Sequence, residues 1–98
     1  MQYNFEWDPV KATINTNKHG VTFEEAIEVF KDPMALTLYE DEESTPDEDR
    51  WVTVGLVNHR HYLLVVHTYH DQSIDGVTIR VISARQATKH EIKQYENG

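Results

Sequence analysis

The sequence predicts one α+β domain spanning residues 1–98, with a mostly antiparallel sheet of four to five strands, two N-terminal helices and one C-terminal helix. The chain of 98 residues is long enough for one hydrophobic core and too short for two. One strand and two helix start signals come first, and four strands then follow one another before a last helix. Strands and helices that occur in runs, without regular alternation, are typical of the α+β class.

The first strand and the first helix are marked by clear local signals. The segment YNFEWD alternates aromatic and polar residues, which predicts a half-buried strand. Asp8 is a suitable N-cap and Pro9 suits the first helical position, while Gly20 is a typical stop. These signals predict a helix over residues 9–19.

This helix is expected to present two different faces. Val10 and Ile14 are four residues apart and are expected to face the core. Lys11, Asn15 and Lys18 follow one another at intervals of four and three residues, so they share another face. That second face is polar and basic.

The second helix is predicted by a capping box. Thr22 is the N-cap and Glu25 lies three residues on, and apolar residues follow at helical spacing. The helix is expected to end near Asp32 and Pro33, because proline disfavours helical geometry in the residue before it.

Four strands are expected in the second part of the chain. A short strand lies within ALTLYE, and three more cover residues 51–57, 62–69 and 77–84, joined by hairpin connections. The segment YLLVVHTY is apolar on both faces, which predicts a central strand. Thr88 and Glu91 form a second capping box and predict a last helix.

The negative charge is concentrated in one segment. The formal net charge is -8, and the segment EDEESTPDED over residues 40–49 holds seven acids and no base. The remaining chain has 10 acids and 9 bases, and is therefore nearly neutral. The acidic segment is expected to be a solvated, mobile loop, and the alternatives are a mimic of nucleic acid or a gate over a site.

Composition excludes several kinds of site. There is no cysteine, so disulfides, thiolate metal sites and cysteine nucleophiles are absent. No segment approaches the roughly 18 apolar residues of a membrane span, and we expect a cytoplasmic protein.

Lys18 and His19 stand together at the end of the first helix. Cations in the last turn interact favourably with the helix dipole and the exposed carbonyls, which is a structural explanation. Alternatively, a cation and an imidazole on a rigid turn suit phosphate binding and general acid-base chemistry near neutral pH.

Three further side chains are candidates for handling an anion. His67 lies within the central strand and is either a buried, hydrogen-bonded core residue or a residue presented to a cleft. Arg80 lies inside a strand and needs a carboxylate partner or a polar groove, since arginine stays charged. Arg85, at the end of that strand, has the geometry to bind an anion through two hydrogen bonds.

A metal site was also considered. His59 and His61 are two residues apart, and His67 and His70 are three apart, but no metal-binding signature such as HExxH is present. We expect no metal and no cofactor.

Several motifs resemble one known family. The segment FEWDPVKATINTNKHGVTFEEAIEVFKDP, the segment LLVVHT and the final IRVISARQATKHEIKQYEN are similar to the BrnT family of small prokaryotic toxins. The resemblance covers residues 5–97. It implies a RelE-like fold and a ribonuclease toxin of a type II toxin-antitoxin pair, which inhibits translation by cutting RNA without a metal.

The resemblance also implies roles and partners. Catalytic candidates are Lys18, His19, His67, Arg80 and Arg85, and RNA-binding candidates are Lys11, Asn15, Arg50 and Lys89. The implied partner is a BrnA-like antitoxin with a ribbon-helix-helix domain, through which the complex reaches operator DNA. Where many members carry an arginine after the central HT, this chain has His70 nearby, and its last helix has only two lysines. The alternative is therefore a weakened or inactive toxin that acts as an antitoxin-binding module.

Overall fold

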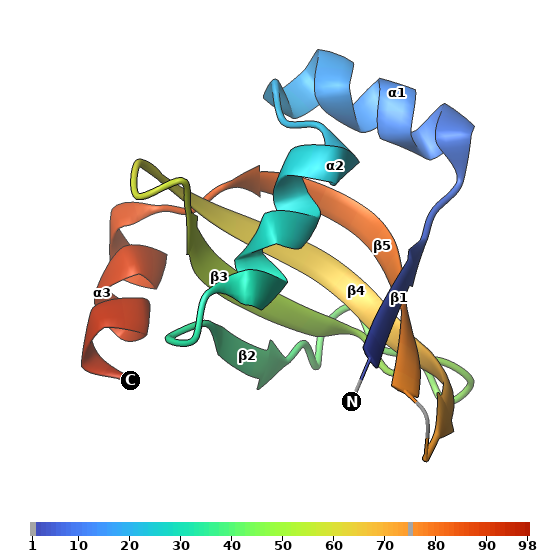
Figure 1. Cartoon of the computed structure of the whole chain (residues 1–98). Coiled ribbons are helices and arrows are strands. Elements are labelled where there is room, and N and C mark those ends of the chain that lie inside the picture. Colours follow the sequence, from blue (N-terminus) through green and yellow to red (C-terminus); the bar gives the residue numbers. More distant parts are fainter. Residues whose placement is uncertain (1, 75) are drawn as a thin grey trace.

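The elements form the α+β fold that the sequence predicts (Figure 1). The computed structural model describes the backbone of residues 2–74 and 76–98, and the side chains of residues 3–70, 74 and 76–98. In chain order the elements are β1 (Gln2–Glu6), α1 (Pro9–His19), α2 (Phe23–Ala26), the 3-10 helix η1 (Ile27–Lys31), β2 (Leu36–Tyr39), β3 (Trp51–Val57), β4 (His61–Ser73), β5 (Gly76–Gln86) and α3 (Lys89–Asn97). Within the described part of the chain, no helix has the length and apolarity that a membrane crossing requires.

The five strands form one sheet in the order β1-β5-β4-β3-β2. β1 runs parallel to β5, and the other neighbouring pairs are antiparallel. The prediction that the YLLVVHTY segment is a central strand is therefore confirmed. β4 and β5 are longer than predicted, and the described part of their connection is correspondingly short. Asn58 and His59 adopt positive φ angles of 53° and 58° in the turn between β3 and β4.

Helix α1 has the predicted ends but a different buried face. The Asp8 side chain accepts a hydrogen bond from the Val10 N–H, and Gly20 ends the helix at φ 71°. The prediction that Val10 and Ile14 face the core is wrong, because these side chains are 67% and 58% exposed. Asn15, expected on the polar face, is buried. Asn15 is buried because α1 lies against the edge of β5, where the β5 backbone needs hydrogen-bond partners.

The core lies between α2, η1 and one face of the sheet. The Thr22–Glu25 capping box is formed as predicted. Phe23, Ala26 and Val29 are fully buried against β4 and β5 residues. η1 packs so closely on β3 that a Cβ at Gly55 would lie 2.9 Å from the Val29 Cβ. A side chain at position 55 is therefore excluded by packing.

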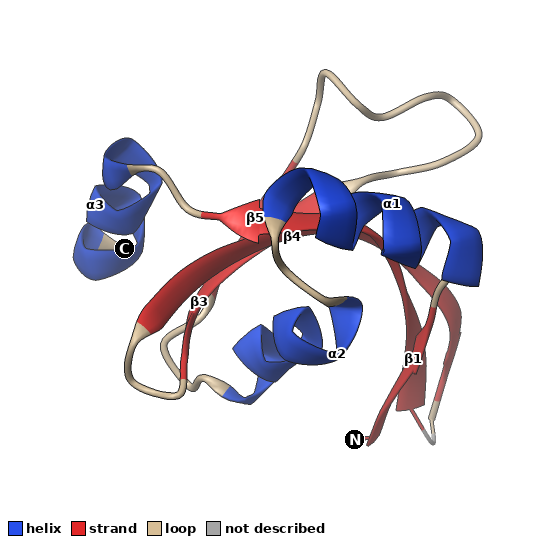
Figure 2. Ribbon diagram, turned by 90° about the horizontal axis from the view of Figure 1, so that it is seen from above, coloured by secondary structure: helices blue, strands red, loops and turns tan. Residues whose placement is uncertain are grey.

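Helix α3 covers only one end of the sheet's other face and has no buried residue. Two polar contacts hold it. The Tyr95 hydroxyl donates to Asp32 at 2.6 Å, and Arg85 forms an ion pair with Glu91 at 2.8 Å. Figure 2 shows the acidic loop, residues 40–50, rising from the sheet on the side opposite α2. This face of the sheet has α3 at one end and the acidic loop at the other, and we call it the open face.

Candidate functional site

Lys18 and His19 lie at the last turn of α1, directly before Gly20. They line a shallow depression of about 210 Å³ together with Lys11, and its opposite wall is formed by Ile82 and Ser83 of β5. We call this depression the basic notch. Both explanations of the Lys-His pair thus fit one geometry, because the residues end the helix and also face a surface depression.

Asn15 holds α1 in this position. Its side-chain nitrogen donates to the backbone oxygens of Ala84 and Val21 at 2.8 and 3.1 Å. Its side-chain oxygen accepts from the Ala84 N–H at 3.0 Å. The β1–β5 pairing ends at Arg80, so Asn15 replaces a neighbouring strand beyond that point. These three hydrogen bonds give Asn15 a structural role, and the expectation that it contacts RNA stays an untested prediction.

A β-bulge shapes the wall of the notch. Val66 pairs with Ser83, whereas His67 pairs with Val81, so Ile82 has no partner across the ladder. The extra residue places Ile82 and Ser83 in the walls of two depressions. The sequence did not predict a role for either residue. A bulge in a strand as apolar as β5 does not disturb the alternation of polar and apolar residues, so it leaves no signal.

The second depression is a groove of about 440 Å³ on the open face. We call it the open-face groove. Its floor is aliphatic, and α3 and the acidic loop lie at its ends. The aliphatic residues of its floor and walls include Leu36, Leu38, Val52, Val54, Leu64 and Val66. The groove meets the basic notch at Ile82 and Ser83.

Arg85 lines this groove and is paired with Glu91. Two of its guanidinium nitrogens donate to the two carboxylate oxygens, each at 2.8 Å. The hydrogen bonds and charge of Arg85 lower the pKa of Glu91 to about 2, and Glu91 in turn raises the pKa of Arg85. Arg85 therefore anchors α3, while its side chain remains 39% exposed.

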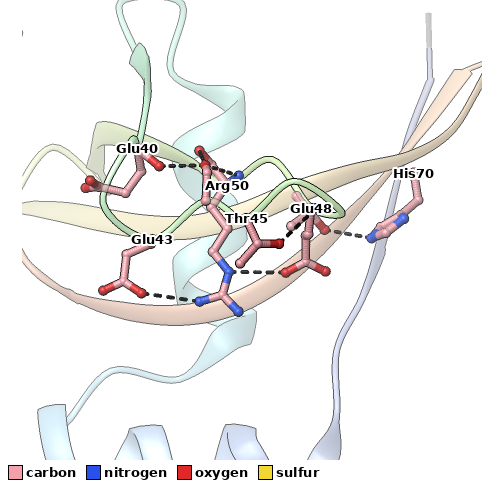
Figure 3. A network of polar contacts seen from close by, with 8 residues as sticks. Glu40, Glu43, Thr45, Glu48, Arg50 and His70 are labelled. Atoms are coloured by element: carbon pink, nitrogen blue, oxygen red, sulfur yellow. Dashed lines mark hydrogen bonds and ion pairs between the residues drawn. The ribbon is translucent and has the colours of Figure 1, made fainter.

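Arg50 organises the acidic loop (Figure 3). Its guanidinium bonds Glu48 at 3.2 Å and Glu43 at 3.5 Å. The backbone at Glu40 and Arg50 is joined by a 2.8 Å hydrogen bond, and Ser44 bonds both ends of the loop. The loop is largely exposed to solvent, as expected, and it is also held by its own polar contacts at the rim of the groove.

Arg80 and Lys89 lie outside the described depressions. Arg80 faces Glu6 of β1 at 3.9 Å, and both side chains are nearly half exposed. It thus has a carboxylate partner, one of the two environments predicted for it. Lys89 is exposed at the start of α3.

His67 is a core residue. It is fully buried, its Nε2 lies 2.7 Å from the Thr53 hydroxyl, and its ring packs edge-on against Phe30 and Tyr69. Burial lowers the pKa of His67 to about 4, since the charged form loses its hydration. Of the two alternatives for His67, the structure has the buried, hydrogen-bonded core residue, and a catalytic role for it stays an untested prediction.

The four histidines considered as metal ligands do not gather. Among the residues whose side chains are described, no group of three or more His, Asp or Glu is placed to hold a metal ion. His70, for example, bonds the Thr68 hydroxyl at 2.7 Å.

Comparison with known proteins identifies the family. A family described as "Ribonuclease toxin, BrnT, of type II toxin-antitoxin system" matches residues 7–91 of this chain. The chain belongs to the BrnT family. The similarity found in the sequence motifs is thereby confirmed, and so is the assignment to the toxins of type II toxin-antitoxin systems. Such a toxin has an antitoxin as its partner.

A solved BrnT structure supports the fold. The crystal structure of the Brucella abortus ribonuclease toxin, BrnT, is similar over 91% of this chain and 100% of that one, with a TM-score of 0.64 and 23% sequence identity. Comparison with curated protein sequences gives no significant match. The BrnT fold of this chain is therefore established by the family match and by the shared architecture.

Proposed function

We propose that this BrnT-family toxin is a metal-independent endoribonuclease that cuts RNA at the basic notch and thereby inhibits translation. The observation that carries the proposal is that Lys11, Lys18 and His19 line one depression together with Ser83, which also lines the open-face groove. None of these three side chains forms an ion pair with a described residue. They are thus available to a phosphate.

The reaction uses the nucleophile that RNA itself carries. The 2'-oxygen attacks the adjacent phosphorus, the bond from phosphorus to the 5'-oxygen breaks, and a cyclic phosphate and a 5'-hydroxyl form. One proton leaves the 2'-oxygen and one reaches the departing 5'-oxygen. In our proposal His19 makes one of these transfers, and Lys18 stabilises the extra negative charge on the phosphate oxygens.

Neighbouring phosphates lie along β5 in this proposal. Lys11 contacts the backbone at one side of the notch, and the exposed part of Arg85 contacts it from the groove side. Arg50 and Arg80 bind carboxylates, and Lys89 lies apart from the notch, so they have no part in the cleavage step.

The proposed partner is a BrnA-like antitoxin with a ribbon-helix-helix domain. It would silence the toxin and carry the complex to operator DNA, while the toxin itself does not bind DNA. The cytoplasm is the proposed location, since both the RNA substrate and the operator are found there.

The test is RNA cleavage by the purified protein in EDTA, with the product ends mapped. Cleavage that leaves a cyclic phosphate and a 5'-hydroxyl is expected, and Lys18→Ala should reduce the rate at least about 100-fold. Lys93→Ala is the matched control, because Lys93 is exposed on α3 and lines neither depression. Cleavage that requires a divalent ion, or equal rates in the two variants, would contradict the proposal.

A second candidate function is an antitoxin-binding module of weak or absent nuclease activity. The observation that favours it is that Arg50, Arg80 and Arg85 all face carboxylates, which reduces their attraction for phosphate. Expression without the antitoxin separates the two candidates. Growth arrest that is lost in Lys18→Ala supports the nuclease, and normal growth with soluble, folded protein supports the binding module.

A further inference from the structure

The open-face groove has an apolar floor that is only partly covered by the described chain: Val54 and Leu64 at its base are buried, whereas Leu36, Val52 and Val66 are half-buried. α2 and η1 pack on the opposite face of the sheet, and α3 reaches only one end. Leu38 of edge strand β2 is 42% exposed, and aliphatic side chains of β3 and β4 extend the floor beside it. An aliphatic surface of this kind favours a partner that removes it from water.

One end of the groove is a fixed negative wall. Glu40, Glu43 and Arg50 of the acidic loop line it, and Arg50 is the only base against the seven acids of residues 40–49. The contacts of Arg50 and Ser44 hold the loop in place (Figure 3). Asp41 and Glu42, which are exposed on the same loop, add further negative charge.

We propose that the open-face groove binds the antitoxin, through a segment with an apolar face and with lysine or arginine side chains at the end that lies against the acidic loop. This rests on the toxin assignment and adds the surface and the chemistry of the partner. The apolar floor supplies the area for burial, and the acidic wall selects the charge and the direction of the segment.

The other occupants fit this groove less well. RNA that continued along the groove floor to the acidic loop would meet negative charge there, and the loop's Arg50 is already paired with Glu43. A second copy of this chain carries a formal charge of -8, so two copies repel each other. A segment with both basic and apolar side chains can pack on the apolar floor and pair with the acidic wall.

The position of the groove also explains how a bound antitoxin inhibits RNA cleavage. Because the groove and the basic notch share Ile82 and Ser83, a segment that fills the groove reaches the wall of the notch. RNA entering beside Lys18 and His19 then meets the bound segment. Antitoxin binding and RNA binding are therefore mutually exclusive without any change in the fold.

The test measures the affinity of the purified toxin for the full-length antitoxin of its own operon, by titration calorimetry. Leu38→Asp should weaken binding at least about 30-fold, since it places a carboxylate in the apolar contact. Val10→Asp is the matched control, because Val10 of α1 is also exposed and lines neither depression. It should change the affinity less than threefold. Thermal unfolding of each variant verifies the fold.

The charge of the partner is tested separately. The double variant Asp41→Asn, Glu42→Gln should weaken binding about tenfold at low salt and much less at high salt. Glu24→Gln, Glu96→Gln removes two exposed carboxylates from other surfaces and should leave the affinity unchanged.

Three outcomes would overturn the proposal. The first is weak binding by Val10→Asp together with normal binding by Leu38→Asp, which places the antitoxin on α1. The second is loss of RNA cleavage in Leu38→Asp with unchanged antitoxin affinity, which makes the groove an RNA path. The third is a toxin dimer that Leu38→Asp dissociates. Cleavage by the free wild-type toxin is measured in parallel, so failure of the nuclease proposal is distinguished from failure of this one.

Discussion

The side-chain amide of Asn15 pairs with both backbone polar groups of Ala84, 69 positions later in the chain. This pair joins α1 to the edge of β5 and sets the distance between the Lys18–His19 turn and the wall of the basic notch. The position of the proposed catalytic residues therefore depends on one buried polar side chain.

Loss of the Asn15–Ala84 hydrogen bonds, which we call the clamp, should reduce the stability of the fold. Asn15→Ala leaves the Ala84 N–H and C=O without a partner and is expected to lower the free energy of unfolding by about 2–4 kcal/mol. Urea denaturation measures the change. Asn17→Ala, an exposed change on the same helix, is the control and should stay within about 0.5 kcal/mol. Equal effects of the two substitutions would show that the clamp contributes nothing.

His67 should make stability depend on pH. Its pKa is about 4 in the folded state, against 6.5 for an ordinary histidine, so the unfolded state binds more protons between these values. Stability is expected to rise from pH 4 to pH 6.5, by up to about 1.4 kcal/mol per pH unit. His67→Leu should flatten this part of the unfolding profile. An unchanged slope in that variant would assign the dependence to other groups.

The Arg85–Glu91 pair should stabilise α3. Glu91→Gln is expected to cost about 1–2 kcal/mol at pH 7, because it weakens both the ion pair and the Thr88 capping box. The pKa of Glu91 is depressed to about 2 from 4.5, so its contribution is lost as the pH falls through this range. Guanidinium denaturation at pH 7 and pH 2.5 should show a smaller difference between the proteins at the lower pH. A constant difference would contradict this account.

Gly55 should tolerate no side chain. An added Cβ would lie 2.9 Å from the Val29 Cβ and 3.1 Å from its backbone oxygen, so Gly55→Ala must push η1 away from β3. The expected loss is about 1–3 kcal/mol. Thermal unfolding measures it. If Gly55→Ala raised the stability, the only effect would be the lower entropy of its unfolded chain. That result would refute the close packing of η1 on β3.

Local signals predicted the elements well. Thr22 with Glu25 and Thr88 with Glu91 are capping boxes whose partners are three residues apart, so their physics is contained in a few consecutive residues. The central position of β4 was also predictable, because residues buried on both faces leave a continuous apolar run.

Long-range features were not predictable from the pattern alone. The exposure of Val10 and Ile14 follows from the ending of β1, which leaves the far part of β5 to be covered by Asn15. Ser83 enters the notch only through a bulge opposite Val66. Pairings between distant segments decide such features, and no periodicity in the sequence encodes them.

The histidines test the central claim most directly. His19 lies in the basic notch, whereas His67 is sealed in the core. RNA cleavage by purified His19→Gln should fall at least about 100-fold, while His67→Leu, assayed at a temperature where it is folded, should stay within about threefold of the wild type. His90→Gln, an exposed change on α3, is the control. Loss of cleavage in folded His67→Leu with full activity in His19→Gln would contradict the placement of the site at the notch.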